Sequence, residues 1–243
     1  MKKWILWGSL VAMAGITSCN KENEKLNAIT IVESQFETTV ESWSGDFAQY
    51  SDALFTGLKK DSLTRAYLQI AMDRARLPVA LDSTKYGLRS QSYNRKDSLF
   101  TFFKKKVAGF IPGRDYNVVF DIDLGTSYFE KSVDSLGSPA AAVYVKAGAS
   151  PNEPVKMLVN GNYKFNLDKG TLSQDGTEMV VLGNASNGTE FQRYARVRRT
   201  NGNKAVKVRP NANGEIWLCV GTESNYKGVS ILYFDKIKIT ISE

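Results

Sequence analysis

The sequence predicts an all-β fold, a single antiparallel β-sandwich, on three observations. Short runs of β-branched and aromatic residues recur between clusters of Gly, Asn, Asp and Pro, as is typical of strands joined by turns. No stretch carries the sustained 3.6-residue apolar period of a long helix, so helical crossovers between parallel strands are not expected. The sequence has no internal repeat and no Pro- or Ser-rich linker after residue 27, which favours one domain over residues 28–243.

Nine runs are predicted as strands. They cover residues 28–36, 99–107, 116–124, 142–146, 178–182, 194–200, 204–209, 215–220 and 229–241. In the run 116–124, the even positions from Val118 to Leu124 are apolar, whereas Asp121 and Asp123 lie on the opposite face. The Asn-Gly pair at 201–202 is a hairpin turn signal and predicts that 194–200 and 204–209 form a hairpin.

Residues 63–77 fit two patterns. Leu63, Tyr67 and Ile70 lie at helical spacing, but residues 67–72 also alternate in the manner of a strand. We interpret this segment as a strand.

The first nineteen residues have the features of an export signal. Lys2 and Lys3 precede an apolar run, 4–16, that is too short for a transmembrane helix and suits a secretory signal. The run ends in Ile-Thr-Ser-Cys at 16–19, which resembles a bacterial lipobox. The resemblance implies a lipoprotein signal peptide over 1–18 and lipidation of Cys19. An ordinary signal peptide, or a cytosolic protein with an apolar N-terminus, is the alternative.

A lipidated Cys19 would make the membrane a partner of this protein. The polar stretch that follows gives a segment 19–27 made of the lipidated Cys and a flexible tether. The expected location is the outer membrane of a Gram-negative bacterium, with the domain facing the periplasm or the cell surface.

The composition excludes several kinds of chemistry. The chain has 243 residues with 32 Lys+Arg, 25 Asp+Glu, two Cys and no His, so Ser-His-Asp triads and His-ligated metals are impossible. No Gly-rich phosphate loop is present and the chain carries an export signal, so neither a nucleotide nor a nucleic acid is expected as a partner. Cys219 stands in the apolar run 216–220 and is predicted to be an inert core cysteine.

Both ends of the domain carry a family resemblance. Phe36-Glu37 followed by Trp43, and the segment Ile-Leu-Tyr-Phe-Asp-Lys-Ile-Lys-Ile at 231–239, are similar to the first and last strands of jelly-roll carbohydrate-binding modules and galactose-binding-like domains. The resemblance implies a jelly-roll-like sandwich with neighbouring terminal strands. It also implies that Glu37 and Asp235 help to bind a structural calcium, unless Asp235 only caps a turn or pairs with a lysine. The rest of the chain looks like an uncharacterised secreted bacterial β-protein.

The same resemblance implies non-catalytic binding of extracellular poly- or oligosaccharide. Candidate aromatic residues for stacking on sugar rings are Tyr50, Tyr128 and Tyr226. The basic side chains of 193–209 are a second candidate, for an anionic glycan, because guanidinium groups match carboxylate and sulfate oxygens. Its candidate residues are Arg196, Arg198, Lys207 and Arg209. The alternative is a basic outer face that keeps a sheet edge soluble.

Two other functions stay open. Asp121 and Asp123 lie about 6.5–7 Å apart along their strand, which makes them the carboxylate pair that a hydrolase without histidine would use. Paired carboxylates on the wet side of a strand are common, and a denser acidic motif is absent, so we do not expect an enzyme. A polysaccharide hydrolase or lyase is one alternative, and a structural or adhesive envelope protein is the other.

Overall fold

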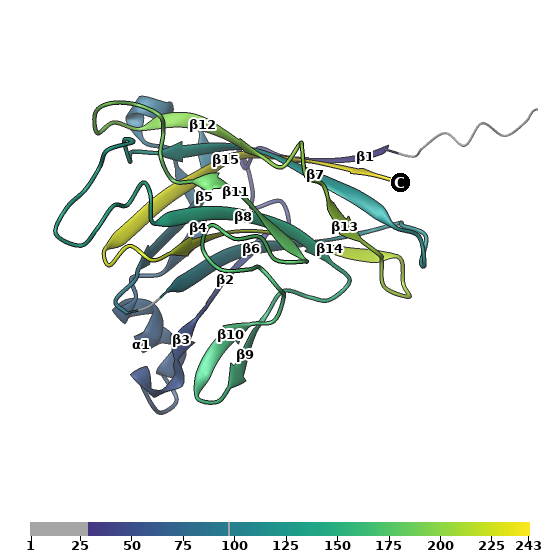
Figure 1. Ribbon diagram of the computed structural model, residues 1–243, viewed down its shortest axis with the longest axis horizontal. Coiled ribbons are helices and arrows are strands. Elements are labelled where there is room, and N and C mark those ends of the chain that lie inside the picture. Colours follow the sequence, from purple (N-terminus) through teal and green to yellow (C-terminus); the bar gives the residue numbers. More distant parts are fainter. Residues whose placement is uncertain (1–28, 97) are drawn as a thin grey trace, which may run out of the picture.

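A computed structural model of the chain describes residues 29–96 and 98–243 (Figure 1). The predicted signal peptide 1–18, Cys19 and the tether lie outside the described residues. Two antiparallel sheets pack face to face with the main hydrophobic core between them, which confirms the β-sandwich prediction. Within the described part of the chain, no helix is long and apolar enough to cross a membrane.

The first sheet is 7-stranded and has the order β12-β7-β15-β5-β4, with β1 beside β15 and β13 beside β7. Its strands are β1 (Ile29–Ser34), β4 (Ala71–Arg76), β5 (Tyr86–Tyr93), β7 (Tyr116–Thr126), β12 (Ala195–Thr200), β13 (Val206–Val208) and β15 (Val229–Ser242). The resemblance to jelly-roll modules implies that the first and last strands are neighbours. The register from Ile29 opposite Ser242 to Ser34 opposite Ile237 confirms this.

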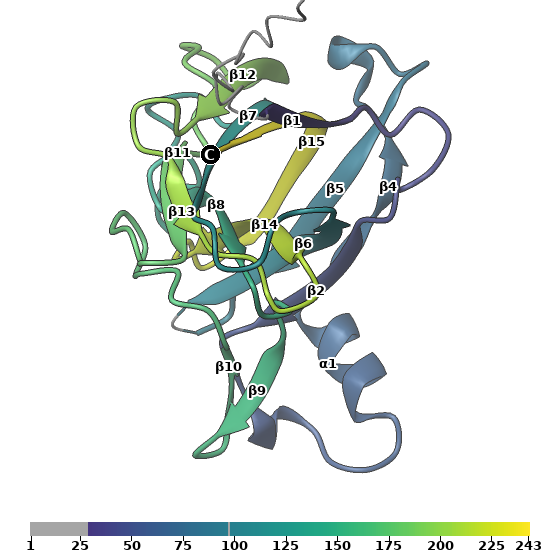
Figure 2. The same cartoon turned by 90° about the vertical axis from the view of Figure 1, so that its right-hand side faces the viewer.

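The second sheet is 5-stranded and has the order β11-β8-β14-β6-β2. Its strands are β2 (Ser44–Ala48), β6 (Leu99–Ala108), β8 (Val143–Ser150), β11 (Met179–Asn184) and β14 (Glu215–Ser224). A small third sheet, β3-β10-β9, projects from the sandwich; its strands are β3 (Tyr50–Ser51), β9 (Lys156–Val159) and β10 (Asn162–Phe165). Figure 2 shows the β9–β10 hairpin and α1 (Lys60–Tyr67) at one end, with the start of β1 at the opposite end.

Buried and outward-facing residues alternate along most of β7, which places its apolar side chains in the core. Val118, Phe120 and Ile122 are fully buried between the sheets, whereas the residues between them face outward. Burying such a side chain contributes about 1.5–3 kcal/mol. Trp43 closes the core beside β1, and its indole Nε1 donates a hydrogen bond of 3.1 Å to Ser34 Oγ.

The strand interpretation of 63–77 is wrong in its first half. The structure has the helix α1 (Lys60–Tyr67) there and begins strand β4 only at Ala71. Thr64 and Leu68 are both buried, whereas Ala66 between them is exposed. A strand would place all three on one face, but a helix separates Ala66 from the other two. The chain then turns at Gln69, whose φ of 48° ends the helix.

The predicted hairpin at 194–209 is also wrong. Strands β12 and β13 do not pair with each other but lie end to end along β7, which is long enough to pair with both. Asn201 occupies the break between them. Its side chain accepts a hydrogen bond from Phe120 N at 2.7 Å and donates one to Val118 O at 3.2 Å, which replaces the missing strand pairing.

Candidate functional site

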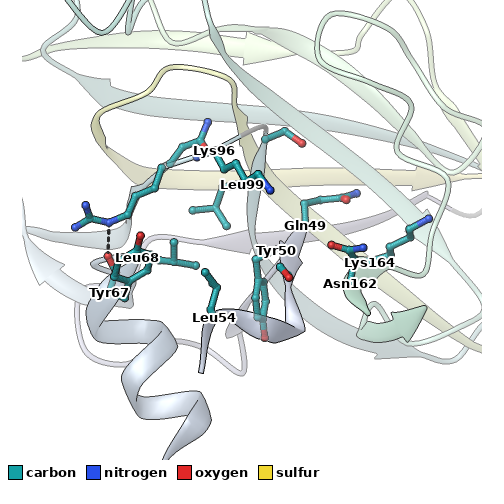
Figure 3. Close-up of a pocket in the computed structure, with 13 residues that line it drawn as sticks. Gln49, Tyr50, Leu54, Tyr67, Leu68, Lys96, Leu99, Asn162 and Lys164 are labelled. Carbon is teal, nitrogen blue, oxygen red and sulfur yellow. Dashed lines mark hydrogen bonds between the residues drawn. The ribbon is translucent and has the colours of Figure 1, made fainter. Parts of the chain in front are cut away.

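A cavity of about 300 Å³ opens where the sandwich meets the projecting layer of α1, β3 and β10 (Figure 3). It is lined by segments that are far apart in the chain: 49–54, 67–68, the loop after β5, and the strand β10. The lining residues are Gln49, Tyr50, Ser51, Leu54, Tyr67, Leu68, Asn94, Arg95, Lys96, Ser98, Leu99, Asn162 and Lys164.

Leucine side chains supply the apolar surface of this cavity. Leu68 and Leu99 are buried and pack with Phe47, while Leu54 packs partly buried against them. Figure 3 shows Leu54 between the rings of Tyr50 and Tyr67. An apolar surface with polar groups around it is the usual make-up of a small-molecule site.

Tyr50 forms one wall and is held by its neighbours. Its ring stacks on Phe47 at 4.9 Å and on Tyr163 at 4.8 Å between ring centroids. Gln49, the residue before Tyr50, has a φ of 71°, and its backbone N–H donates a hydrogen bond to the backbone oxygen of Tyr163. Burial raises the pKa of Tyr50 above its ordinary value against the opposing effect of Lys156, so the hydroxyl stays protonated at neutral pH and available as a donor.

Tyr67 and Arg95 form the opposite wall. Tyr67 is the last residue of α1, and 40% of its surface remains exposed. The guanidinium of Arg95 lies 4.4 Å from the centroid of the Tyr67 ring and 3.9 Å from that of Tyr93. Arg95 Nε also donates to Tyr67 O at 2.8 Å, so the guanidinium is fixed in orientation.

Amides and cations surround the cavity. Gln49, Asn162, Lys96 and Lys164 line it, and Figure 3 shows Lys96 on the β5–β6 side and Lys164 on the β10 side. Asn94 has a structural role, because its amide donates to Ser224 O at 2.9 Å. Tyrosine rings, an apolar surface, amides and cations together suit a polar ligand with apolar faces, such as a sugar.

Of the tyrosines predicted to bind sugar, only Tyr50 lies in this cavity. Tyr128 and Tyr226 line a separate cavity of about 220 Å³, and their hydroxyl groups are already used. The Tyr226 hydroxyl donates to Asp134, and the side chain is buried. Tyr128 accepts from Ile231 N at 2.8 Å, and burial raises its pKa to about 12. Tyr226 is part of the hydrophobic core, and Tyr128 packs against it.

The structure pairs most of the basic side chains predicted to bind an anionic glycan with aspartates. Arg196 is ion-paired with Asp235. Arg198 forms two hydrogen bonds of 2.6 Å with Asp121. Arg209 forms two with Asp115, and Lys207 is exposed on the same edge. These contacts fit the alternative reading, a charged outer face of the sheet.

The same pairing bears on the role open to Asp121, one of the two predicted catalytic carboxylates. The hydrogen bonds from Arg198 hold the pKa of Asp121 below its ordinary value, against a smaller opposing effect of burial. A carboxylate that stays ionised cannot act as the general acid of a glycosidase, whose pKa is raised. Asp123 faces a different neighbourhood, a polar cavity that Glu37 and Asp235 also line.

Glu37 and Asp235, the residues that resemble calcium ligands, therefore lie at one cavity of about 310 Å³. Arg196 and Lys236 line it as well, and Asp235 is already paired with Arg196. Over 29–96 and 98–243, no group of three or more acidic or cysteine side chains is placed to hold a metal ion. In this arrangement the donor set does not fit calcium, which asks for six to eight oxygen ligands.

Sequence reasoning missed Tyr67, Arg95 and Lys164. The helical spacing of Leu63 and Tyr67 was the signal that could have placed Tyr67 beside the cavity. No local pattern marks Arg95 or Lys164, because only the tertiary structure brings them to the same opening.

No family model matches this chain, and no curated protein matches it. Among solved structures, TmCBM61 in complex with β-1,4-galactotriose has 13% identity and a TM-score of 0.31, over 69% of this chain and 81% of that one. The enzymatically active domain of bacteriophage CBA120 tailspike protein 4 has 9% identity and a TM-score of 0.32, over 84% of this chain and 20% of that one. A carbohydrate-binding module of the β-sandwich superfamily has 10% identity and a TM-score of 0.27, over 88% of this chain and 57% of that one. All three TM-scores are below 0.5, so none of these likenesses bears on function.

Proposed function

We propose that this protein binds extracellular carbohydrate without catalysis, in the cavity between Tyr50 and Tyr67. The observation that carries the proposal is the pairing of these two rings, on opposite walls, with an apolar surface and side-chain amides. Sugar rings offer apolar faces and a rim of hydroxyl groups. The leucines and the exposed Tyr67 ring can meet the apolar faces, and the amides can meet the hydroxyl groups. Phe47 and Tyr163 cover both faces of the Tyr50 ring, so Tyr50 contributes its edge and its hydroxyl group. The volume of about 300 Å³ is at the lower end of the range for ligand pockets, which suits a short oligosaccharide or the end of a chain.

The proposal includes attachment to a membrane. Cleavage before Cys19 and its lipidation would anchor the protein in the outer membrane of a Gram-negative bacterium. Metabolic labelling with a radioactive fatty acid tests this, with Cys19→Ala as the control. Label that persists in Cys19→Ala, or that is absent from the unaltered chain, contradicts the anchor.

Glycan binding is tested by affinity gel electrophoresis of the full chain through a panel of neutral and acidic polysaccharides. We expect at least one to retard the protein, and Tyr67→Ala to weaken that interaction about tenfold, which corresponds to 1.4 kcal/mol. Phe191→Ala is the matched control, because this ring is also exposed but lies outside the cavity. No retardation by any polysaccharide contradicts the proposed function.

The absence of catalysis is tested with a polysaccharide that retards the protein in the affinity gel. Incubation with the full chain should leave the chain length of the glycan unchanged and produce neither new reducing ends nor unsaturated products. Product formation that survives Asp121→Asn and Asp123→Asn would show an enzyme with a site elsewhere.

A further inference from the structure

Three cations line the proposed sugar cavity, and no carboxylate does among the described lining residues. Arg95 and Lys96 come from the loop after β5, and Lys164 comes from β10 on another side. All three are exposed, and none forms an ion pair with any other described residue. The described lining of the cavity therefore offers positive charge that it does not itself neutralise.

Several cations elsewhere on the surface lie beside carboxylates. Arg198 faces Asp121, Arg209 faces Asp115, and Lys106 faces Glu215 at 2.8 Å. Even within the projecting layer, Lys156 contacts Asp61 at 3.1 Å. What distinguishes Arg95, Lys96 and Lys164 is that three cations without a described ion pair converge on one opening, an arrangement that an anionic ligand would complete.

Arg95 has the geometry to receive an anion. Its Nε is used by Tyr67 O and its plane lies against two tyrosine rings, yet its two Nη atoms make no hydrogen bond to another described side chain or carbonyl. A guanidinium held in this way loses little conformational entropy when a carboxylate or sulfate binds to it.

We propose that the saccharide held in this cavity is acidic, and that Arg95, Lys96 and Lys164 recognise its carboxylate or sulfate groups. The inference rests on the proposed function and names the ligand class for that site. The Tyr67 ring and the leucines would hold the sugar ring, while the cations select a charged sugar over its neutral counterpart.

The test measures how tightly the full chain binds the acidic and the neutralised form of each glycan. Polygalacturonate, alginate, hyaluronan and chondroitin sulfate are each run beside their carboxyl-reduced or desulfated forms, with retardation in affinity gels giving relative affinities. We expect an acidic form to bind at least tenfold more tightly than its neutralised partner. Increasing NaCl from 50 to 500 mM should remove most of that difference. Comparing the loss of affinity on carboxyl reduction with the loss on desulfation shows whether the cavity recognises carboxylate or sulfate groups.

Lys164→Gln provides the residue-level test. This side chain is exposed and makes no hydrogen bond to another described residue, so its loss should leave folding unchanged while weakening the acidic ligand about fivefold. Lys131→Gln is the matched control, an exposed lysine outside the cavity. Equal losses in both variants would reduce the effect to net charge and overturn the inference.

The two proposals fail in different ways. If acidic and neutralised forms bind equally and Tyr67→Ala weakens both, the carbohydrate site stands and its preference for acidic sugars is overturned. If no glycan of either kind retards the protein, the proposed function fails and the inference fails with it.

Discussion

The ammonium of Lys146 lies 3.1 Å from Oε2 of Glu223, and both side chains are buried on the outer face of the second sheet. The carboxylate also accepts a hydrogen bond from the buried Lys169 at 2.5 Å and one from Leu172 N at 3.0 Å. Lys146 donates in turn to Lys169 O and to Gln174 O. One glutamate therefore compensates two lysines and ties the 166–178 loop over the sheet.

Glu223→Gln should strongly destabilise the protein. The substitution keeps the shape of the side chain but leaves two buried ammonium groups without a counter-charge, which costs about 3–5 kcal/mol of the free energy of unfolding. Urea unfolding followed by tryptophan fluorescence measures the loss. Asp115→Asn is the control, because its pair with Arg209 is exposed and screened by solvent, so its loss should change the urea midpoint little. Similar urea midpoints for the two variants would contradict the compensating role of Glu223.

The hydrogen bonds to the Asp168 carboxylate predict that the protein loses stability in acid. The amides of Thr177 and Gly170 and the Thr177 hydroxyl donate to its carboxylate and hold its pKa below the ordinary 3.8. A carboxyl whose pKa is lower in the folded state stabilises the fold above its unfolded pKa, and this contribution is lost as the pH falls through the folded pKa. The free energy of unfolding should therefore fall below about pH 4.

Asp168→Asn isolates this contribution. The variant should be less stable than the unaltered chain at pH 7 and should lose less stability between pH 5 and pH 3, as measured by urea unfolding at each pH. Asp123→Asn is the control, since that carboxylate accepts no hydrogen bond from another described residue. If the free energy of unfolding of Asp168→Asn falls as steeply between pH 5 and pH 3 as that of the unaltered chain, Asp168 is not a source of the acid sensitivity.

The sequence was sufficient for the sandwich because its signal is local. Alternation along residues 116–124 and at 237–241 states which face of each strand is buried, and the structure follows it. The Asn-Gly signal at 201–202 was misleading for a physical reason. It correctly marks a turn, but β7 runs past both flanking strands, and the ladder along β7 displaces the hairpin pairing.

The candidate site was predicted only in part because it is made by tertiary contacts. Tyr50 could be chosen as an aromatic residue between two strands, but Tyr67 faces the cavity only because 60–67 is a helix. A helix of 8 residues is too short to be stable by propensity alone and depends on the packing of Thr64 and Leu68. The pairing of the basic residues in 193–209 with aspartates was equally invisible, since the partner strands come from distant segments.

Cys219 should be unreactive in the folded protein. The structure confirms it as a buried core residue between the sheet and the aromatic cluster of Phe100, Phe102 and Phe165. Burial raises the pKa of the Cys219 thiol well above its ordinary value, so the nucleophilic thiolate does not form at neutral pH. In Cys19→Ala, where Cys219 is the sole cysteine of the sequence, a thiol reagent should react only after denaturant is added. Reaction at the rate of a free thiol in native buffer would contradict this burial.

The pair between Arg196 and Asp235 predicts how the protein responds to calcium. The Arg196 guanidinium is ion-paired with the Asp235 carboxylate, which the jelly-roll resemblance assigns as a calcium ligand. We therefore expect the Tm to be the same in millimolar calcium and in EDTA. A ligand that binds only the folded state must raise the Tm, which makes thermal unfolding a sensitive test. Arg196→Gln provides the complementary measurement, because it frees Asp235 beside Glu37 and Asp123. A calcium-dependent Tm in the unaltered chain that disappears in Asp235→Asn would show that Asp235 binds the ion and that Arg196 gives way to it.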